Sequence, residues 1–334
     1  MRTERFTLGV PSSKRTVAAS LVVLAAMLVV PFVTTPYYTG LAMTALVFLM
    51  LGVSWNLLAG YAGQISLGHA AFFGLGAYVA AWLTTPAAAG LPAIPVPLSH
   101  PIVALVLGGV GAALVALVTG PVMFRLRGHY FAIGTLALAA IIRLVLTDKR
   151  SISGGSTGYY LNAGMGEVPT YLLTVVVAAL ATVGVYLVVN SRLGLGMRAI
   201  HDDETAASGL GVDPLRYKMY AFLISAFIAG LAGAAYALNS LYINPTSTLA
   251  VTWTVDTLVI VILGGMGTVA GPLFGTVVFM VIDNGLTSVL GGLATTVEGV
   301  IIILVVIFLP DGIYGSLKSY VAGRNESDDA ATSG

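Results

Sequence analysis

Residues 191–218 read SRLGLGMRAIHDDETAASGLGVDPLRYK and carry four basic and four acidic residues in an otherwise apolar part of the chain. Apolar runs at 171–189 and 219–238 flank this segment, and both are long enough to cross a bilayer. Because charged residues are costly inside a membrane, the segment between the two runs must emerge into water. We call residues 191–218 the coupling segment.

The interior of the coupling segment predicts a short helix from about Gly196 to Ser208, ended by Gly209 and Gly211. Asp213 and Pro214 then predict a helix N-cap followed by a proline at the first helical position.

Such a charged helix can be no more than a solvated connection between two spans. Its apolar residues among the charges favour docking onto a partner protein. The predicted docking residues are Met197, Arg198, Ile200, Asp202, Asp203, Glu204, Ala206, Ala207, Gly209 and Gly211.

The composition of the whole chain predicts a membrane protein. Of 334 residues, 57% are hydrophobic and 9% are charged, whereas soluble proteins are about one quarter charged. No Asp, Glu, Lys or Arg occurs in residues 16–124. We therefore expect an all-α, polytopic transmembrane helical bundle. The net charge of +1 gives no reason to expect a nucleic-acid partner, and the absence of cysteine excludes disulfides and thiolate metal sites.

The apolar runs predict about ten spans, or eight to ten if a glycine-rich piece only dips into the membrane. They lie at residues 17–33, 38–59, 60–83, 101–124, 130–146, 171–189, 219–238, 253–264, 276–282 and 297–309. The coupling segment then falls between spans six and seven. We expect an N-terminal segment at 1–16, a transmembrane domain at 17–311 and a C-terminal tail at 312–334. The first run is expected to be an uncleaved span.

Basic residues predict the orientation, because they concentrate on the cytosolic side. With ten spans, only Lys149 and Arg150 fall in the loops of one side. The other side, which holds both termini and the coupling segment, is therefore predicted to be cytosolic. It carries Arg2, Arg5, Lys14, Arg15, Arg125, Arg127, Arg192, Arg198, Arg216, Lys218, Lys318 and Arg324.

Motifs of catalysis and nucleotide binding give no support for an enzyme. The chain has no P-loop and no HExxH motif, and its four histidines do not pair at metal-ligand spacing. We expect no catalytic residue, no metal site and no cofactor on this chain. Transport against a concentration gradient would then need energy from a partner protein or from an ion gradient.

Two glycine-rich stretches, at residues 60–76 and 264–275, interrupt the helical pattern in the two halves of the chain. Interrupted spans at corresponding positions indicate the substrate pathway of a transporter. Close packing between helices through small residues is the alternative, and the pattern leaves both open. The candidate pathway residues are Gln64, Ser66, His69, Gly264, Gly265, Gly267 and Gly271.

Five pieces of the sequence together resemble the permeases of branched-chain amino acid ATP-binding cassette importers, and the M-type subunit in particular. The resemblance covers roughly residues 39–314, and the pieces are GYAGQISLGHAAFFGLGAY, RLRGHYFAIGTLAL, SGGSTG, LGLGMRAIHDDETAASGLGVDPLRYKMYAFLISAFIAGLAGAAYA and VILGGMGTVAGPLFG.

The resemblance implies a location in a prokaryotic inner membrane and a set of partners. These are a second, H-type permease, two ATP-binding subunits that carry ATP and Mg²⁺, and an extracytoplasmic solute-binding protein. It also implies a Glu-Ala-Ala…Gly docking loop. The nearest match is Glu204-Thr205-Ala206-Ala207, followed by Gly209, and the inserted Thr205 departs from the pattern.

The resemblance implies import of branched-chain or other apolar amino acids, with urea, short amides or small organic acids as alternative substrates. The loops at 84–99, 148–167 and 239–252 are expected to receive the binding protein. A stand-alone ion-coupled transporter or channel is the alternative function. It would use Asp256, Asp283 or Glu298, the acidic residues in or near the last spans.

Overall fold

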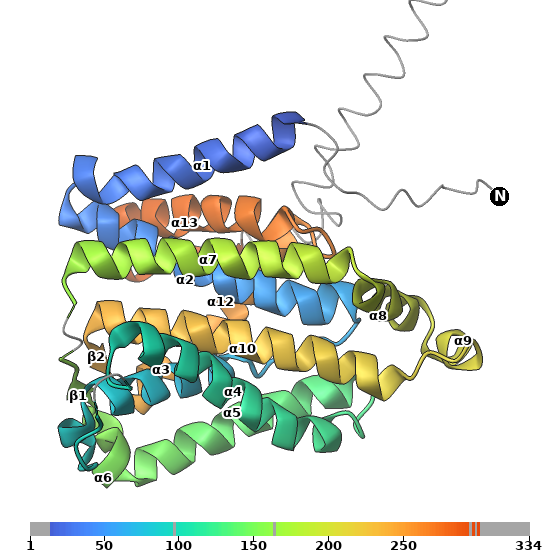
Figure 1. The fold of residues 1–334 in the computed structure, drawn as a ribbon, viewed down its shortest axis with the longest axis horizontal. Helices are drawn as coiled ribbons and strands as arrows, with labels where there is room; N and C mark the ends of the chain where they lie inside the picture. Colours follow the sequence, from blue (N-terminus) through green and yellow to red (C-terminus); the bar gives the residue numbers. More distant parts are fainter. Residues whose placement is uncertain (1–13, 96–97, 163–164, 294–295, 298, 301–334) are drawn as a thin grey trace, which may run out of the picture.

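The computed structural model describes residues 14–95, 98–162, 165–293, 296–297 and 299–300, and in this part the chain is almost entirely helical (Figure 1). The long helices are α1 (Lys14–Val33), α2 (Pro36–Asn56), α3 (His69–Thr84), α4 (Pro101–Met123), α5 (His129–Asp148), α7 (Glu167–Val189), α10 (Pro214–Ser240), α12 (Thr252–Gly264) and α13 (Gly271–Leu290). The short elements are η1 (Leu57–Tyr61), η2 (Pro86–Ala89), α6 (Arg150–Ser153), η3 (Gly155–Thr157), β1 (Tyr159–Tyr160), α8 (Arg192–Asp202), α9 (Glu204–Gly209), β2 (Tyr242–Ile243), α11 (Pro245–Thr248) and η4 (Gly291–Leu293).

Seven helical segments within the described residues are long and apolar enough to cross a membrane. They comprise α2 with η1, then α4, α5, α7, α10, α11 with α12, and α13. The all-α polytopic prediction is thus confirmed. α3 has 16 residues and is shorter than a typical span, although it lies inside the bundle (Figure 1). The predicted span at 297–309, Glu298, the first 13 residues and the tail at 312–334 lie outside the described residues, apart from isolated positions.

The outward faces of α4, α5 and α7 are apolar. Val118 on α4, Tyr130 on α5 and Leu180 on α7 are 76%, 72% and 66% exposed. A water-soluble protein rarely exposes so much continuous apolar surface, whereas a lipid-facing helix must do so. These faces fit a bilayer.

α10 is the central helix and packs against α2, α3, α4 and α7. Its crossing with α3 depends on glycine: a Cβ added at Gly76 would overlap the backbone of Gly230, and one at Gly233 would overlap Phe73. Two membrane helices can approach this closely only where a residue without a side chain lies at the contact. The glycines therefore set the distance between α3 and α10.

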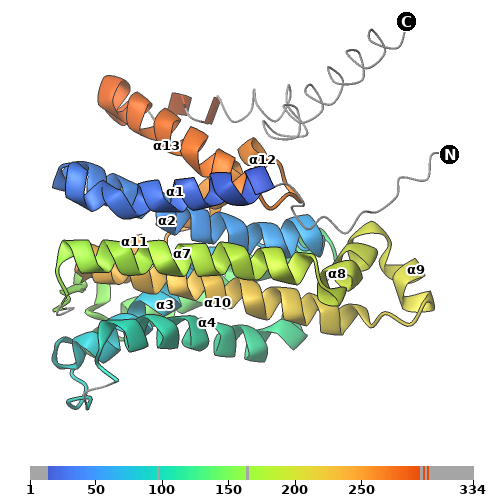
Figure 2. The same ribbon diagram turned by 45° about the horizontal axis from the view of Figure 1, so that its top comes forward.

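The two ends of the bundle differ. α8 and α9 lie at one end in both views (Figures 1 and 2), and α6, β1 and β2 lie at the other end (Figure 1). At the second end β1 pairs antiparallel with β2, with Tyr159 opposite Ile243. Asn162 also donates a backbone hydrogen bond to Thr85 Oγ1 over 2.8 Å. Three loops that are distant in sequence thus form one surface, opposite the coupling segment.

Replacing Gly76 with alanine should lower the free energy of unfolding by about 2 kcal/mol, because the added methyl group overpacks the α3–α10 crossing. The matched control is Gly184→Ala on α7, where an added Cβ meets nothing within 4 Å. Thermal unfolding in detergent measures both variants. Equal melting temperatures for the two would contradict the proposed role of the crossing.

Candidate functional site

The first glycine-rich stretch is broken where the sequence predicts a break. Helix α2 ends in a π-helical turn, η1, residues 62–68 are not helical, and α3 begins at His69. We call residues 62–68 the first break. Gly63 adopts φ +67°, a conformation that favours glycine. The predicted interruption is therefore confirmed.

The polar backbone of the first break finds its partners on other helices. Ser66 O accepts a hydrogen bond from Trp55 Nε1 of α2 over 2.8 Å. Leu67 N donates to Thr135 Oγ1 of α5 over 3.0 Å. Just beyond the break, Ala70 N donates to Thr254 Oγ1 of α12 over 2.9 Å. Side chains of α2, α5 and α12 thus stabilise backbone that an isolated helix would leave unpaired.

His69 and Ser66 lie in this buried polar centre. The ring of His69 is 1% exposed, and its Nε2 lies 2.8 Å from Ser225 Oγ of α10. Its Nδ1 has no hydrogen-bond partner within the described structure. Ser66 is fully buried, and its hydroxyl accepts from Gly68 N over 3.2 Å. Gln64 is half-buried, and its amide donates to Ala62 O over 3.2 Å. The structure therefore buries two of the three predicted polar pathway residues.

The second glycine-rich stretch forms the turn between α12 and α13, which we call the second break (residues 265–270). Asn56, the last residue of α2, joins the second break to the end of that helix. The Asn56 amide donates to Thr268 O and accepts from Gly267 N, both over 2.8 Å. A Cβ at Gly60 would come within 2.9 Å of Gly267 Cα, so the two stretches touch.

The predicted pathway glycines of the second stretch are closely packed. Gly264, Gly265 and Gly271 are buried, and a Cβ at Gly264 would overlap the backbone of Gly271. Gly267 is half-buried and adopts φ +78°. In this conformation these glycines serve close packing, which is one of the two alternatives for their role.

The coupling segment forms two helices rather than the one predicted from Gly196 to Ser208. α8 begins earlier, at Arg192, and ends at Asp202, and Asp203 interrupts the helix with φ −155°. The Asp203 carboxylate instead accepts from Thr205 N and Ala206 N, and so caps α9. An aspartate followed by free N–H groups stabilises a helix start, which is why the chain breaks here. Asp213 and Pro214 begin α10 as predicted.

Three of the predicted docking residues face this chain's own core. Met197, Ile200 and Ala207 are at most 4% exposed. The amphipathic α8 packs its apolar side against the bundle, so these side chains anchor the segment and do not face a partner. The exposed members of the predicted set are Asp202, Asp203, Glu204, Ala206, Gly209 and Gly211, and Leu210 beside them is 86% exposed.

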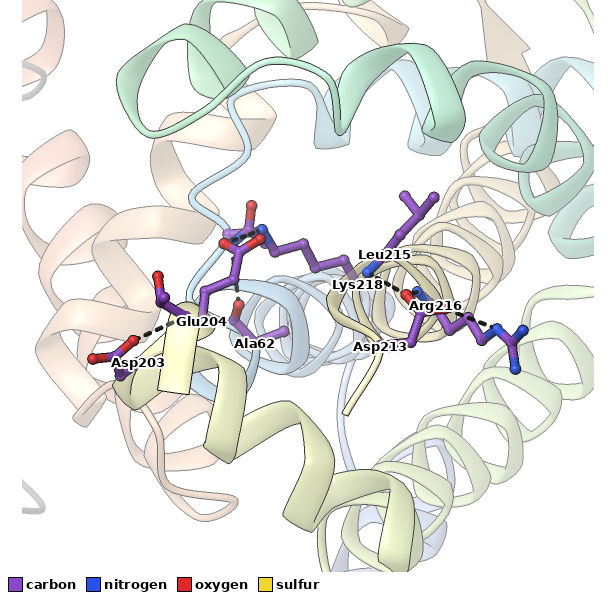
Figure 3. Close-up of polar contacts among 9 residues, drawn as sticks. Ala62, Asp203, Glu204, Asp213, Leu215, Arg216 and Lys218 are labelled. Carbon is purple, nitrogen blue, oxygen red and sulfur yellow. Dashed lines mark hydrogen bonds and ion pairs between the residues drawn. The ribbon is translucent and has the colours of Figure 1, made fainter. Parts of the chain in front are cut away.

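An ion pair joins α9 to α10. Lys218 Nζ donates to Glu204 Oε2 over 2.6 Å, and the Lys218 side chain is 10% exposed (Figure 3). A nearly buried ammonium group needs such a partner, since an unpaired charge there would be costly. Glu204 and Asp203 thus have partners inside the chain, and removing either perturbs α9 itself.

The coupling segment touches the first break directly. The Arg198 guanidinium of α8 lies 5.4 Å from the centre of the Tyr61 ring and donates to Val189 O over 3.1 Å. A Cβ at Gly63 would lie 3.4 Å from His201 Cα, so the end of α8 rests on the break. Displacing α8 would therefore push on the η1–α3 connection.

The sequence did not predict most of the residues that form hydrogen bonds with the first break and with His69. Trp55, Thr135, Ser225 and Thr254 are ordinary residues of apolar helices, and nothing in their local pattern marks them. Asn56 carried a signal, because a carboxamide is rare in the middle of an apolar run.

No arrangement of side chains in the described residues fits catalysis or metal binding. Gly154-Gly155-Ser156-Thr157-Gly158 matches the GxSxG pattern of hydrolases. However, Ser156 lies on the 3-10 turn η3 and not on the strand-to-helix turn that this nucleophile requires. No cluster of three His, Asp or Glu side chains that could hold a metal ion occurs in the part of the chain described.

These features define a multi-pass helical membrane protein with two adjacent helix breaks and a charged segment packed against one of them. Residues 37–309 match the family model described as branched-chain amino acid transport system / permease component. The chain belongs to this family.

The chain is also similar to several known transport permeases. The chain is 26% identical to the high-affinity branched-chain amino acid transport system permease protein LivM of Escherichia coli (strain K12), over 88% of this chain and 74% of the relative. The probable LivM of Methanocaldococcus jannaschii is 27% identical over 55% of this chain and 57% of the relative. The ribose import permease protein RbsC of Haemophilus influenzae is 26% identical over 71% of this chain and 75% of the relative. No solved structure matches the chain.

Replacing Asn56 with alanine should lower the free energy of unfolding by about 2 kcal/mol, because it leaves Gly267 N and Thr268 O without their partners. Asn190→Ala is the control, since the Asn190 amide donates to Tyr186 O of the preceding turn. Thermal unfolding of both variants tests the prediction. A larger loss of stability in Asn190→Ala than in Asn56→Ala would contradict the prediction.

Proposed function

We propose that this chain is one permease subunit of an ATP-driven importer of branched-chain or other apolar amino acids. Its partners would be a second, related H-type permease, two ATP-binding subunits and a solute-binding protein. The observation that carries the proposal is the direct contact between the coupling segment and the first break, through Arg198 on Tyr61 and His201 against Gly63.

Docking of an ATP-binding subunit would involve the exposed surface of α9 and its flanks. Leu210, directly after α9, is 86% exposed, and Asp202 and Asp203 before α9 are exposed as well. A partner that covers Leu210 would remove apolar surface from water, which favours association. α9 is in turn held to α10 by the Glu204–Lys218 pair. A partner's movement would thus reach a membrane helix without passing through a loose linker.

In the proposed mechanism, solute arrives at the joined loops of the opposite end, which contain β1, α6 and β2. It then passes near the two breaks, where Gln64, Ser66, His69, Gly264, Gly265, Gly267 and Gly271 lie. Closure of the ATP-binding subunits would move α8 and α9, which displaces the first break and switches access between the two sides. This is the alternating access expected of transporters with interrupted helices.

The substrate class rests on the family description and on the LivM relatives, whose names specify branched-chain amino acids. The similarity to a ribose permease indicates that related folds carry other solutes. We therefore propose apolar amino acids first, and urea, short amides or small organic acids as the alternative. ATP and Mg²⁺ would bind the partner subunits, and this chain would bind no cofactor. The membrane would be the prokaryotic inner membrane, with both termini in the cytosol.

Replacing Leu210 with aspartate should abolish co-purification of the ATP-binding subunit, because it places a charge at the centre of the docking surface. Folding should be unaffected, because the side chain is exposed. The full chain is co-expressed with the candidate ATP-binding subunits, purified by a tag on this chain alone, and assayed for ATP hydrolysis.

Leu98→Asp is the matched control, since Leu98 is 45% exposed and lies outside the coupling segment. It should retain the ATP-binding subunit. Loss of the subunit in both variants, or in neither, would show that α9 is not the docking element.

A further inference from the structure

A half-open cavity of about 430 Å³ lies where α9 meets the first break and the α4–α5 turn. The first break, the α4–α5 turn, α9 and the start of α10 each contribute to its wall. It is lined by Gln64, Arg127, Gly128, Glu204, Thr205, Ser208, Pro214 and Lys218. It therefore separates the predicted docking helix from the predicted pathway.

The charges around the cavity do not cancel. Lys218 and Glu204 neutralise one another at 2.6 Å (Figure 3). Arg127 is exposed, and no carboxylate of the described residues lies within ion-pair distance of it. One cation is thus left over, beside a nearly buried ammonium group that can donate further hydrogen bonds. A carboxylate is one of the oxyanions that a guanidinium and an ammonium group can bind with charge-assisted hydrogen bonds.

The remaining lining is polar or small, and Pro214 is its largest apolar side chain. Such a wall can recognise the charged end of a small molecule and offers no pocket for an aliphatic side chain. The Gln64 amide donates to Ala62 O over 3.2 Å, which keeps this predicted pathway residue on the wall of the cavity. The cavity is therefore placed where the pathway would open towards the coupling segment.

We propose that this cavity binds small carboxylates, and that its ligand in transport is the amino acid just released on the coupling-segment side. The identity of the ligand rests on the proposed function. An occupied cavity holds α9 against the α4–α5 turn, and so opposes the movement that the next cycle requires. Accumulated product thereby slows its own import.

Binding is tested on the full chain in nanodiscs by ligand-observed NMR, with leucine, glycine, 4-methylpentanoate, leucinamide and inorganic phosphate as probes. The three carboxylates should bind with similar affinity, and leucinamide and phosphate more weakly. Arg127→Gln should weaken leucine binding about tenfold, because it removes a charge-assisted hydrogen bond. Arg125→Gln, two residues away on the same turn and outside the cavity lining, should leave binding unchanged.

Equal affinities in the two variants would overturn the proposal, as would phosphate binding as tightly as leucine. Loss of the ATP-binding subunit in Arg127→Gln with unchanged leucine affinity would also overturn it, because the cavity would then receive a partner's acidic side chain. The ligand-binding measurements by NMR need no partner, so they test the cavity even if the importer fails to assemble.

The effect on transport is tested in proteoliposomes of the assembled importer, with leucine added on the ATPase side. Leucine should slow ATP-driven uptake in the unchanged protein and in Arg125→Gln, and have little effect in Arg127→Gln. Equal inhibition of both variants would refute the feedback role.

Discussion

The non-helical backbone between η1 and α3 imposes the constraint on which the rest of the structure depends. Peptide groups that are buried away from water need hydrogen-bond partners from the protein, because an unpaired group costs free energy. Trp55 of α2 and Thr135 of α5 pair with the break itself, and Thr254 of α12 pairs with Ala70 in the first turn of α3. The bundle must therefore bring α2, α5 and α12 together around one short segment.

Contacts at the edges of the break join it to its neighbours. Asn56 ties the end of α2 to the turn between α12 and α13, Arg198 of α8 lies over Tyr61 of η1, and Gly63 of the break contacts His201. Packed elements with discrete contacts move together, so the proposed displacement of α8 would be passed on to the break. These contacts are separate from the hydrogen bonds of the broken backbone, and they join the charged segment to the bundle.

Features encoded within a few residues could be predicted from the sequence. The start of α10 at Asp213 and Pro214, the glycine breaks and the all-α class follow from caps, glycine content and apolar runs. The cap at Asp203 is equally local, but the adjacent Asp202 and Glu204 hid it within a charged run. The split into α8 and α9 was therefore missed.

Long-range partners could not be predicted. Asn56 and Thr268 are 212 positions apart, and Leu67 and Thr135 are 68 apart. Only the packed bundle decides which threonine of an apolar helix faces a broken backbone. For the same reason Met197 and Ile200, which the sequence predicts to face a partner protein, are instead buried against the bundle.

The most direct test of the account is leucine uptake into proteoliposomes that contain this chain, with and without its proposed partners. The account predicts uptake only in the complete assembly, dependent on ATP and insensitive to ionophores that collapse proton and sodium gradients. Uptake by this chain alone, driven by an ion gradient, would contradict it and direct attention to Asp256 and Asp283.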